Sequence, residues 1–131
     1  MVNYYYIKIA KNDNTFNEQL QYTLNTQSIG IGFEYKQEIL NINNLNVNDN
    51  SKRMYNKFIN EINIGDVVFL CKGENTILYI ATIDSEYYFD NNNIINGQLQ
   101  LPHRRKLSNI VKFNSIAPKR MVQTIYNVRN F

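Results

Sequence analysis

Residues 51–71, SKRMYNKFINEINIGDVVFLC, decide the fold, because they join an amphipathic helix directly to a buried strand. From Tyr55 onward, apolar side chains recur at i, i+3, i+4 and i+7, which predicts a helix capped by Ser51 and running to about Asn63. The Gly65-Asp66 pair ends this helix. The uninterrupted apolar run that follows, 67–71, predicts a strand that is buried on both faces.

Upstream of this stretch, the chain predicts a strand, a helix and a second strand. Residues 4–10 alternate apolar and polar side chains, as a half-buried strand does. Thr15-Phe16-Asn17-Glu18 has the pattern of a capping box and predicts that a short helix follows. Residues 29–35 alternate again, and Gly30 and Gly32 remove two side chains from one face. Another backbone or a ligand should therefore approach that face closely.

The rest of the chain predicts a loop and then mostly strands. Residues 36–50 are rich in Asn and are expected to form a loop with one helical turn. After residue 71 we expect a tight turn (72–75) and a returning strand (76–83), and then an aromatic segment (87–89) and a polar loop (90–98). A further strand (107–113) and a terminal segment (117–131) follow. In the terminal segment Met121, Ile125 and Val128 recur at roughly helical spacing. This order favours an α+β fold, a small mixed β-barrel with helices packed on its outside.

Composition excludes several classes of protein. The chain has 131 residues, enough for a single domain over 1–131, with one Cys and one His. It therefore lacks the residues for an intramolecular disulfide or a structural zinc site. No secretory signal or apolar run of membrane-spanning length is present. We accordingly expect a cytoplasmic monomer with no cofactor, no metal and no membrane partner.

Catalytic residues are not marked out by any local motif. Cys71 lies in an apolar run, where a thiol behaves as a small hydrophobe, and His103 has no acidic neighbour in the sequence. Gly30-Ile31-Gly32 lacks the third glycine of a dinucleotide-binding loop. We therefore expect that the chain is not an enzyme. A small hydrolase is an alternative, and it predicts a turnover that His103→Ala or Cys71→Ala abolishes.

Cations and aromatic rings gather in the second half of the chain. No Asp or Glu occurs after Asp90, so positive charge is concentrated in 91–131 and above all in the run 103–106, His-Arg-Arg-Lys. Three consecutive rings, 87–89, precede this run. Because side chains alternate along a strand, at least one of the three should face away from the others. Cations for phosphates together with rings for stacking are what nucleic-acid binding requires.

Several motifs, in order, resemble a known family. Residues 58–68, FINEINIGDVV, look like the "F-x-x-E-I-x-x-G-D-x-V" element of EVE-like domains, which belong to the PUA/YTH superfamily and occur at the N-terminus of McrB-type modification-dependent restriction GTPases. Residues 72–73, 80–83 and 86–89 are similar to "K-G … I-G-x-V … D-Y-Y-Y". Residues 101–107 resemble "Y-x-H-R-R-x-V", and 29–33 resemble "I-x-I-G-W".

The resemblance implies a PUA/EVE/YTH-like barrel that binds nucleic acid, DNA in preference to RNA, as the targeting module of a restriction system. A GTPase domain would then belong to the parent chain. Such a module reads a modified, methylated base that flips into an aromatic pocket. Our candidates for the pocket are Phe33, Tyr35, Tyr87, Tyr88 and Phe89. Our candidates for phosphate contacts are Lys72, His103, Arg104, Arg105 and Lys106.

Three alternatives stay open at this point. The module could read a modified or structured RNA, or it could be a protein-interaction or regulatory domain that binds no nucleic acid. The cations also have a second interpretation, in which His103 and Arg104 tie their strand to the barrel by hydrogen bonds.

Overall fold

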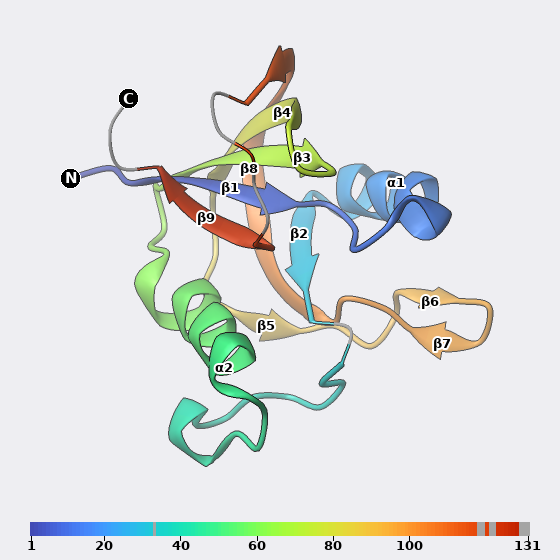
Figure 1. Cartoon of the computed structure of the whole chain (residues 1–131), viewed down its shortest axis with the longest axis vertical. Helices are drawn as coiled ribbons and strands as arrows, with labels where there is room; N and C mark the ends of the chain where they lie inside the picture. The colour runs from blue at the N-terminus through green and yellow to red at the C-terminus, as the bar shows by residue number, and fades with distance from the viewer. Residues whose placement is uncertain (33, 118–119, 121–122, 129–131) are drawn as a thin grey trace.

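A curled seven-stranded sheet, a separate two-stranded hairpin and two α-helices are the main elements of the described residues, 1–32, 34–117, 120 and 123–128 of the computed structural model. The fold is a mixed α+β structure in which the sheet curls into a half-barrel (Figure 1). The expected α+β class is therefore confirmed, and the architecture is compatible with a small β-barrel.

The sheet is built mostly from strands that are distant in sequence. Its order is β2 (Ser28–Ile31), β8 (His103–Ile116), β4 (Thr76–Ile83), β3 (Val67–Lys72), β1 (Tyr4–Lys8) and β9 (Ile125–Val128). Neighbouring strands are antiparallel except β1 and β3, which run parallel. The short strand β5 (Tyr88–Phe89) pairs with β8, and β6 (Ile94–Ile95) pairs with β7 (Gln98–Leu99) in a separate hairpin.

The long strand β8 bends from one side of the half-barrel to the other. Its first four residues, 103–106, pair with β2, and the first two of these also pair with β5. The part of the strand from Leu107 to Ile116 runs along β4, with register shifts in the pairing that indicate bulges. The basic run of the sequence is therefore strand backbone that pairs with β2 over its whole length and with β5 over its first two residues, and the strand is longer than the predicted range of 107–113.

Two helices pack beside the sheet. The first, α1 (Phe16–Thr26), follows the 3-10 turn η1 (Asp13–Thr15), and α2 (Asp49–Asn56) follows the turn η2 (Ile42–Asn44) and continues into the π-helical turn η3 (Lys57–Glu61). Both helices were predicted, but their caps differ. Thr15 makes no side-chain capping bond, and Asn48, in place of Ser51, caps α2 by accepting from the Ser51 amide at 2.8 Å.

The terminal segment corrects a second prediction. Ile125 and Val128 belong to strand β9, which pairs with the edge of β1, although their spacing suggested a helix; Met121 lies outside the described residues. Tertiary pairing determines this segment, because the exposed edge of β1 offers backbone hydrogen bonds to any strand that can reach it. The predicted polar loop after residue 90 likewise contains the β6–β7 hairpin.

The core has two parts, one on each face of the sheet. The larger part fills the concave side between the sheet and both helices, with Ile7, Ile31, Phe58, Leu70 and Ile83 among its buried residues. A smaller cluster lies on the other side: Tyr6, Phe69, Cys71, Ile77 and Ala117. Strand β3 supplies both clusters, so the prediction that it is buried on both faces is confirmed.

Candidate functional site

His103 is the centre of a cluster of aromatic rings at the start of β8. Four ring centroids lie 5.2 to 6.1 Å from the imidazole centroid, those of Tyr35, Tyr55, Tyr87 and Phe89. Tyr35 and Tyr87 stack on the imidazole, and Tyr55 meets it edge-on. His103 and Tyr55 are buried, whereas the other three rings are half-buried. We call these five residues the His103 aromatic cluster.

Hydrogen bonds fix the tautomer of His103. Its Nε2 lies 2.7 Å from the carbonyl oxygen of Tyr35, which can only accept, so the imidazole donates from Nε2. Nδ1 must then accept from the Tyr87 hydroxyl at 2.8 Å, and that hydroxyl accepts from the amide of Ile39 at 3.1 Å. These bonds tie the loop after β2, which carries Tyr35, to strand β8.

Burial keeps this histidine neutral. Removal from water lowers the pKa of His103 below its ordinary value of 6.5, although the bond to the Tyr35 carbonyl partly opposes the shift. Burial also raises the pKa of Tyr87. At neutral pH the cluster is therefore an uncharged group of rings in which both imidazole nitrogens and the Tyr87 hydroxyl are hydrogen-bonded.

The three consecutive rings divide as their alternation predicts. Tyr87 and Phe89 face His103, whereas the ring of Tyr88 lies 5.4 Å from the ammonium of Lys106. Three of the five predicted pocket residues, Tyr35, Tyr87 and Phe89, thus lie in one cluster. Tyr88 is next to the cluster on the opposite face of β5, and Phe33 lies outside the described residues.

Arg104 points inward, which corrects its predicted contact with phosphate. It has no exposed surface, and its guanidinium donates to the hydroxyl and the carbonyl of Ser28, at 3.0 and 2.7 Å, and to the carbonyl of Leu101 at 3.3 Å. Gly30 leaves the necessary space, because a Cβ there would lie 2.2 Å from Nη1 of Arg104. The close approach that the glycine pattern predicts is therefore made by an internal side chain.

Arg105 is also internal, so its predicted phosphate contact is corrected in the same way. Its guanidinium donates to the carbonyls of Phe58 and Ile62 at 2.7 and 2.8 Å, and to that of Ser85 at 2.7 Å. The first two acceptors lie in and directly after the π-helical turn η3. The buried His103 likewise has no open nitrogen for a phosphate. These contacts match the alternative interpretation, in which the run ties its strand to the barrel.

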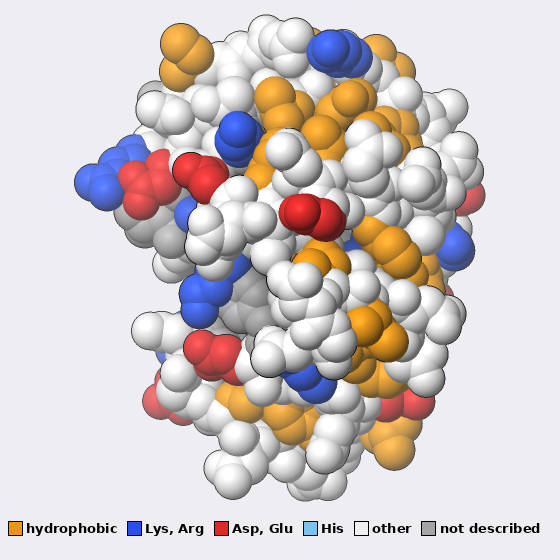
Figure 2. Space-filling model, turned by 90° about the vertical axis from the view of Figure 1, so that its right-hand side faces the viewer, with side chains coloured by type: hydrophobic (Ala, Val, Ile, Leu, Met, Phe, Trp, Pro, Cys, Tyr) orange, Lys and Arg blue, Asp and Glu red, His pale blue; other side chains and the backbone are white. Residues whose placement is uncertain are grey.

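The two remaining predicted cations are exposed but lie apart. Lys72 places its ammonium 4.7 Å from the ring of Phe16, and Lys106 donates to the carbonyl of Thr26 at 3.2 Å. Phe16 and Thr26 are the ends of α1, so these contacts are separated by the helix length of about 16 Å. Of the two, Lys106 is the one that lies against Tyr88, the ring next to the aromatic cluster on the opposite face of β5. Figure 2 shows the same dispersal, with Lys and Arg separated by polar and apolar atoms on the face presented.

Two contributors to this region were not among the predicted site residues. Tyr55 was assigned to the core stripe of its helix, and a stripe gives no signal that one of its members completes an aromatic cluster. Tyr22 donates to the carboxylate of Asp90 at 2.5 Å, and its ring lies 5.0 Å from the guanidinium of Arg104. Burial and the bond to Asp90 raise the pKa of Tyr22 to about 12.

The geometry offers little support for nucleophilic or metal chemistry. Cys71 is fully buried in the smaller core cluster, and burial raises the pKa of its thiol to about 12, so it is protonated at neutral pH. No group of three or more His, Cys, Asp or Glu side chains that could hold a metal ion occurs among the described residues. No helix in the same part of the chain has the length and apolar character to span a bilayer.

Comparison with known proteins yields one family. No curated protein matches the chain at a significant level. A family model does match, and it extends over residues 5–129, which include every strand and helix described above except the first residue of β1. The chain therefore belongs to the family described as Domain of unknown function (DUF8426).

Proposed function

We propose that the chain is a nucleic-acid-binding module that holds one unstacked base against the His103 aromatic cluster. The observation that carries the proposal is that Tyr35, from the loop after β2, converges with Tyr87 and Phe89, from the segment of β5, around one neutral imidazole. All three rings keep part of their surface exposed. Base–ring stacking contributes roughly 1–3 kcal/mol per base and tolerates any base, which suits such a surface.

The chemistry of the cluster favours a base that carries an extra methyl group. The rings are uncharged, and the imidazole nitrogens and the Tyr87 hydroxyl are already paired, so a methyl group displaces none of these hydrogen bonds and gains about 0.8 kcal/mol from burial. Lys106, beside Tyr88, is placed to approach a neighbouring phosphate. We therefore propose a modified base in DNA as the target, and binding to RNA is the alternative outcome of the test.

We also propose that the half-barrel is of the PUA, EVE and YTH type. The motif residues behind that resemblance hold elements together in this chain. Asp66, for example, accepts from the amides of Asn3 and Asn63 at 3.0 and 2.8 Å, which joins the end of η3 to the start of β1. The two buried arginines act similarly. The motifs therefore support the architecture, and the ring cluster supports the function, that of a targeting module for a restriction system with its GTPase elsewhere.

A binding panel tests the function. Short DNA duplexes carrying 5-methylcytosine, 5-hydroxymethylcytosine or N6-methyladenine are compared with unmodified duplexes, single strands and RNA of the same sequence, by fluorescence anisotropy. We expect one modified DNA to bind at least about tenfold more tightly than its unmodified control. Equal affinity for every member would rule out recognition of a modified base. A preference for RNA would make RNA the target in place of DNA. No binding to any member would overturn the proposed function.

Tyr35→Ala tests the site itself. We expect this variant to bind the preferred oligonucleotide roughly tenfold more weakly, because it removes one stacking surface while keeping the backbone carbonyl that holds His103. Phe113→Ala is the matched control, since Phe113 is also partly exposed but lies against Phe69 in the other cluster. An equal loss of affinity in both variants would contradict the assignment of the site.

A further inference from the structure

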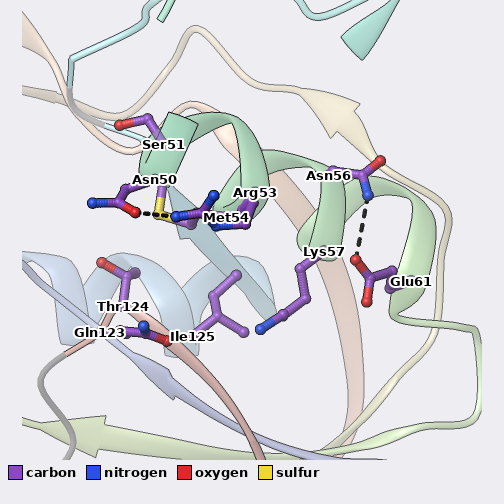
Figure 3. Close-up of a pocket in the computed structure, with 10 residues that line it drawn as sticks. All are labelled: Asn50, Ser51, Arg53, Met54, Asn56, Lys57, Glu61, Gln123, Thr124 and Ile125. Atoms are coloured by element: carbon purple, nitrogen blue, oxygen red, sulfur yellow. Dashed lines mark hydrogen bonds between the residues drawn. The ribbon is translucent and has the colours of Figure 1, made fainter. Parts of the chain in front are cut away.

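A cavity of about 450 Å³ lies between α2 and the start of β9, away from the proposed base site (Figure 3). Its volume lies within the range of roughly 300–1,000 Å³ that small-molecule sites occupy. Polar side chains from both walls line it, among them Asn50, Ser51 and Thr124, and Ile125 contributes an apolar patch. The cavity thus has hydrogen-bonding groups on opposite walls.

Lys57 is the feature that identifies the ligand class. Its side chain is half-buried and extends from the first residue of η3, directly after α2, into the cavity toward Ile125 (Figure 3). No hydrogen bond or ion pair of its ammonium is found in the described residues. A second cation, Arg53, lines the same cavity and is hydrogen-bonded to Asn50. The one acid in the lining, Glu61, is turned to Asn56, whose amide donates to it at 3.3 Å.

The backbone at Lys57 is also unusual. Lys57 opens the π-helical turn η3, in which the amide of Ile62 donates to the carbonyl of Lys57 at 3.0 Å. Such turns widen a helix locally and occur frequently at functional sites. The buried Arg105 supports this turn by donating to the carbonyls of Phe58 and Ile62. The backbone of the turn that Lys57 opens is therefore held against the core.

We propose that this cavity binds a phosphate group through Lys57, with Arg53 and the polar side chains of both walls completing the contacts. Two sources carry that chemistry, a free nucleotide and the backbone of a nucleic acid. An unpaired ammonium can donate hydrogen bonds to the phosphate oxygens of either. The inference does not rest on the proposed function, because a free nucleotide can occupy the cavity whether or not the aromatic cluster binds a base.

Amide chemical shifts of the full chain test the proposal. AMP, inorganic phosphate, adenosine and a short single-stranded oligonucleotide are titrated separately against the ¹⁵N-labelled protein. We expect saturable shifts in residues 50–57 and 123–125 with a phosphate-bearing probe and none with adenosine. Binding of AMP identifies a nucleotide site, and binding of the oligonucleotide alone identifies a backbone contact. Shifts with adenosine equal to those with AMP, or no shifts with any probe, overturn the proposal.

Lys57→Gln supplies the second readout. We expect the affinity of the phosphate-bearing probe to fall by about tenfold, the loss of one charge-assisted hydrogen bond. Lys52→Gln is the matched control, since it makes the same change of charge on the adjoining helix α2, and Lys52 lines a different cavity. Equal loss in the two variants would mean that general charge, and not this cavity, attracts the probe. Thermal unfolding of both variants establishes that each is folded.

Discussion

At the scale of single residues, His103 couples the aromatic cluster to pH. Its folded pKa is lowered below 6.5 by burial, so below pH 6.5 the unfolded chain binds more protons than the folded one. The contribution of His103 to the free energy of unfolding is thus fully present above that pH. It is lost as the pH falls, by at most about 1.4 kcal/mol per pH unit. His103 is the only histidine in the sequence, so urea titrations between pH 6.5 and 5, compared with a variant that lacks it, measure its effect.

The control for this prediction is His103→Gln, which keeps a polar side chain but cannot titrate. We expect its free energy of unfolding to be lower at every pH, because the bonds to Tyr87 and Tyr35 are disturbed, but nearly flat over the same pH range. If both proteins show the same slope, the coupling assigned to His103 is wrong.

At the scale of elements, Arg105 is the residue that holds the π-helical turn η3 in place. Lysine carries the same charge but lacks the planar fork that reaches Phe58, Ile62 and Ser85 together. We expect Arg105→Lys to lower the free energy of unfolding by roughly 1–3 kcal/mol, because a buried carbonyl loses its donor. Hydrogen exchange should quicken first in residues 57–62. Uniform quickening across the sheet, with no preference for η3, would contradict a local role.

The elements also show what local pattern predicts and what it does not. The amphipathic stripe of α2 and the buried run of β3 were predictable, because each element's own period or composition reports its environment. The β6–β7 hairpin turns at Asn96-Gly97, and both residues have positive φ. Asn-Gly is a sequence signal for a hairpin turn, but the segment that contains it was predicted only as a loop. Strand β9 had no such local signal, since its pairing with β1 depends on residues more than a hundred positions away.

At the scale of the whole molecule, the aromatic half of the candidate site was more predictable than the cationic half. Alternation alone separates Tyr88 from its two neighbours, and the structure bears this out. A run of cations in a sequence does not indicate whether its side chains point into the core or toward solvent. An arginine that donates to several internal carbonyls and one that binds phosphate look the same in sequence. In the structure, the pairing of β8 with β2 and β5 places the side chains of Arg104 and Arg105 in the interior.

This burial leaves little charge on the surface for general attraction to nucleic acid. The net charge of +3 includes two buried guanidiniums, and Arg120 is paired with Glu74. If the bound duplex meets Lys106, Arg53 and Lys57, about three phosphates are neutralised, and the slope of log affinity against log salt is about −2.7. Affinity should then fall roughly fortyfold between 50 and 200 mM salt.

Anisotropy titrations across that salt range, with the preferred oligonucleotide from the binding panel, measure the slope. Lys106→Gln should make it shallower by somewhat less than one unit, and Phe113→Ala should leave it unchanged. A thousandfold loss of affinity over the same range would require six or more phosphate contacts. So broad a basic surface is incompatible with two arginines held in the core, and binding would then have to involve a rearrangement that releases them.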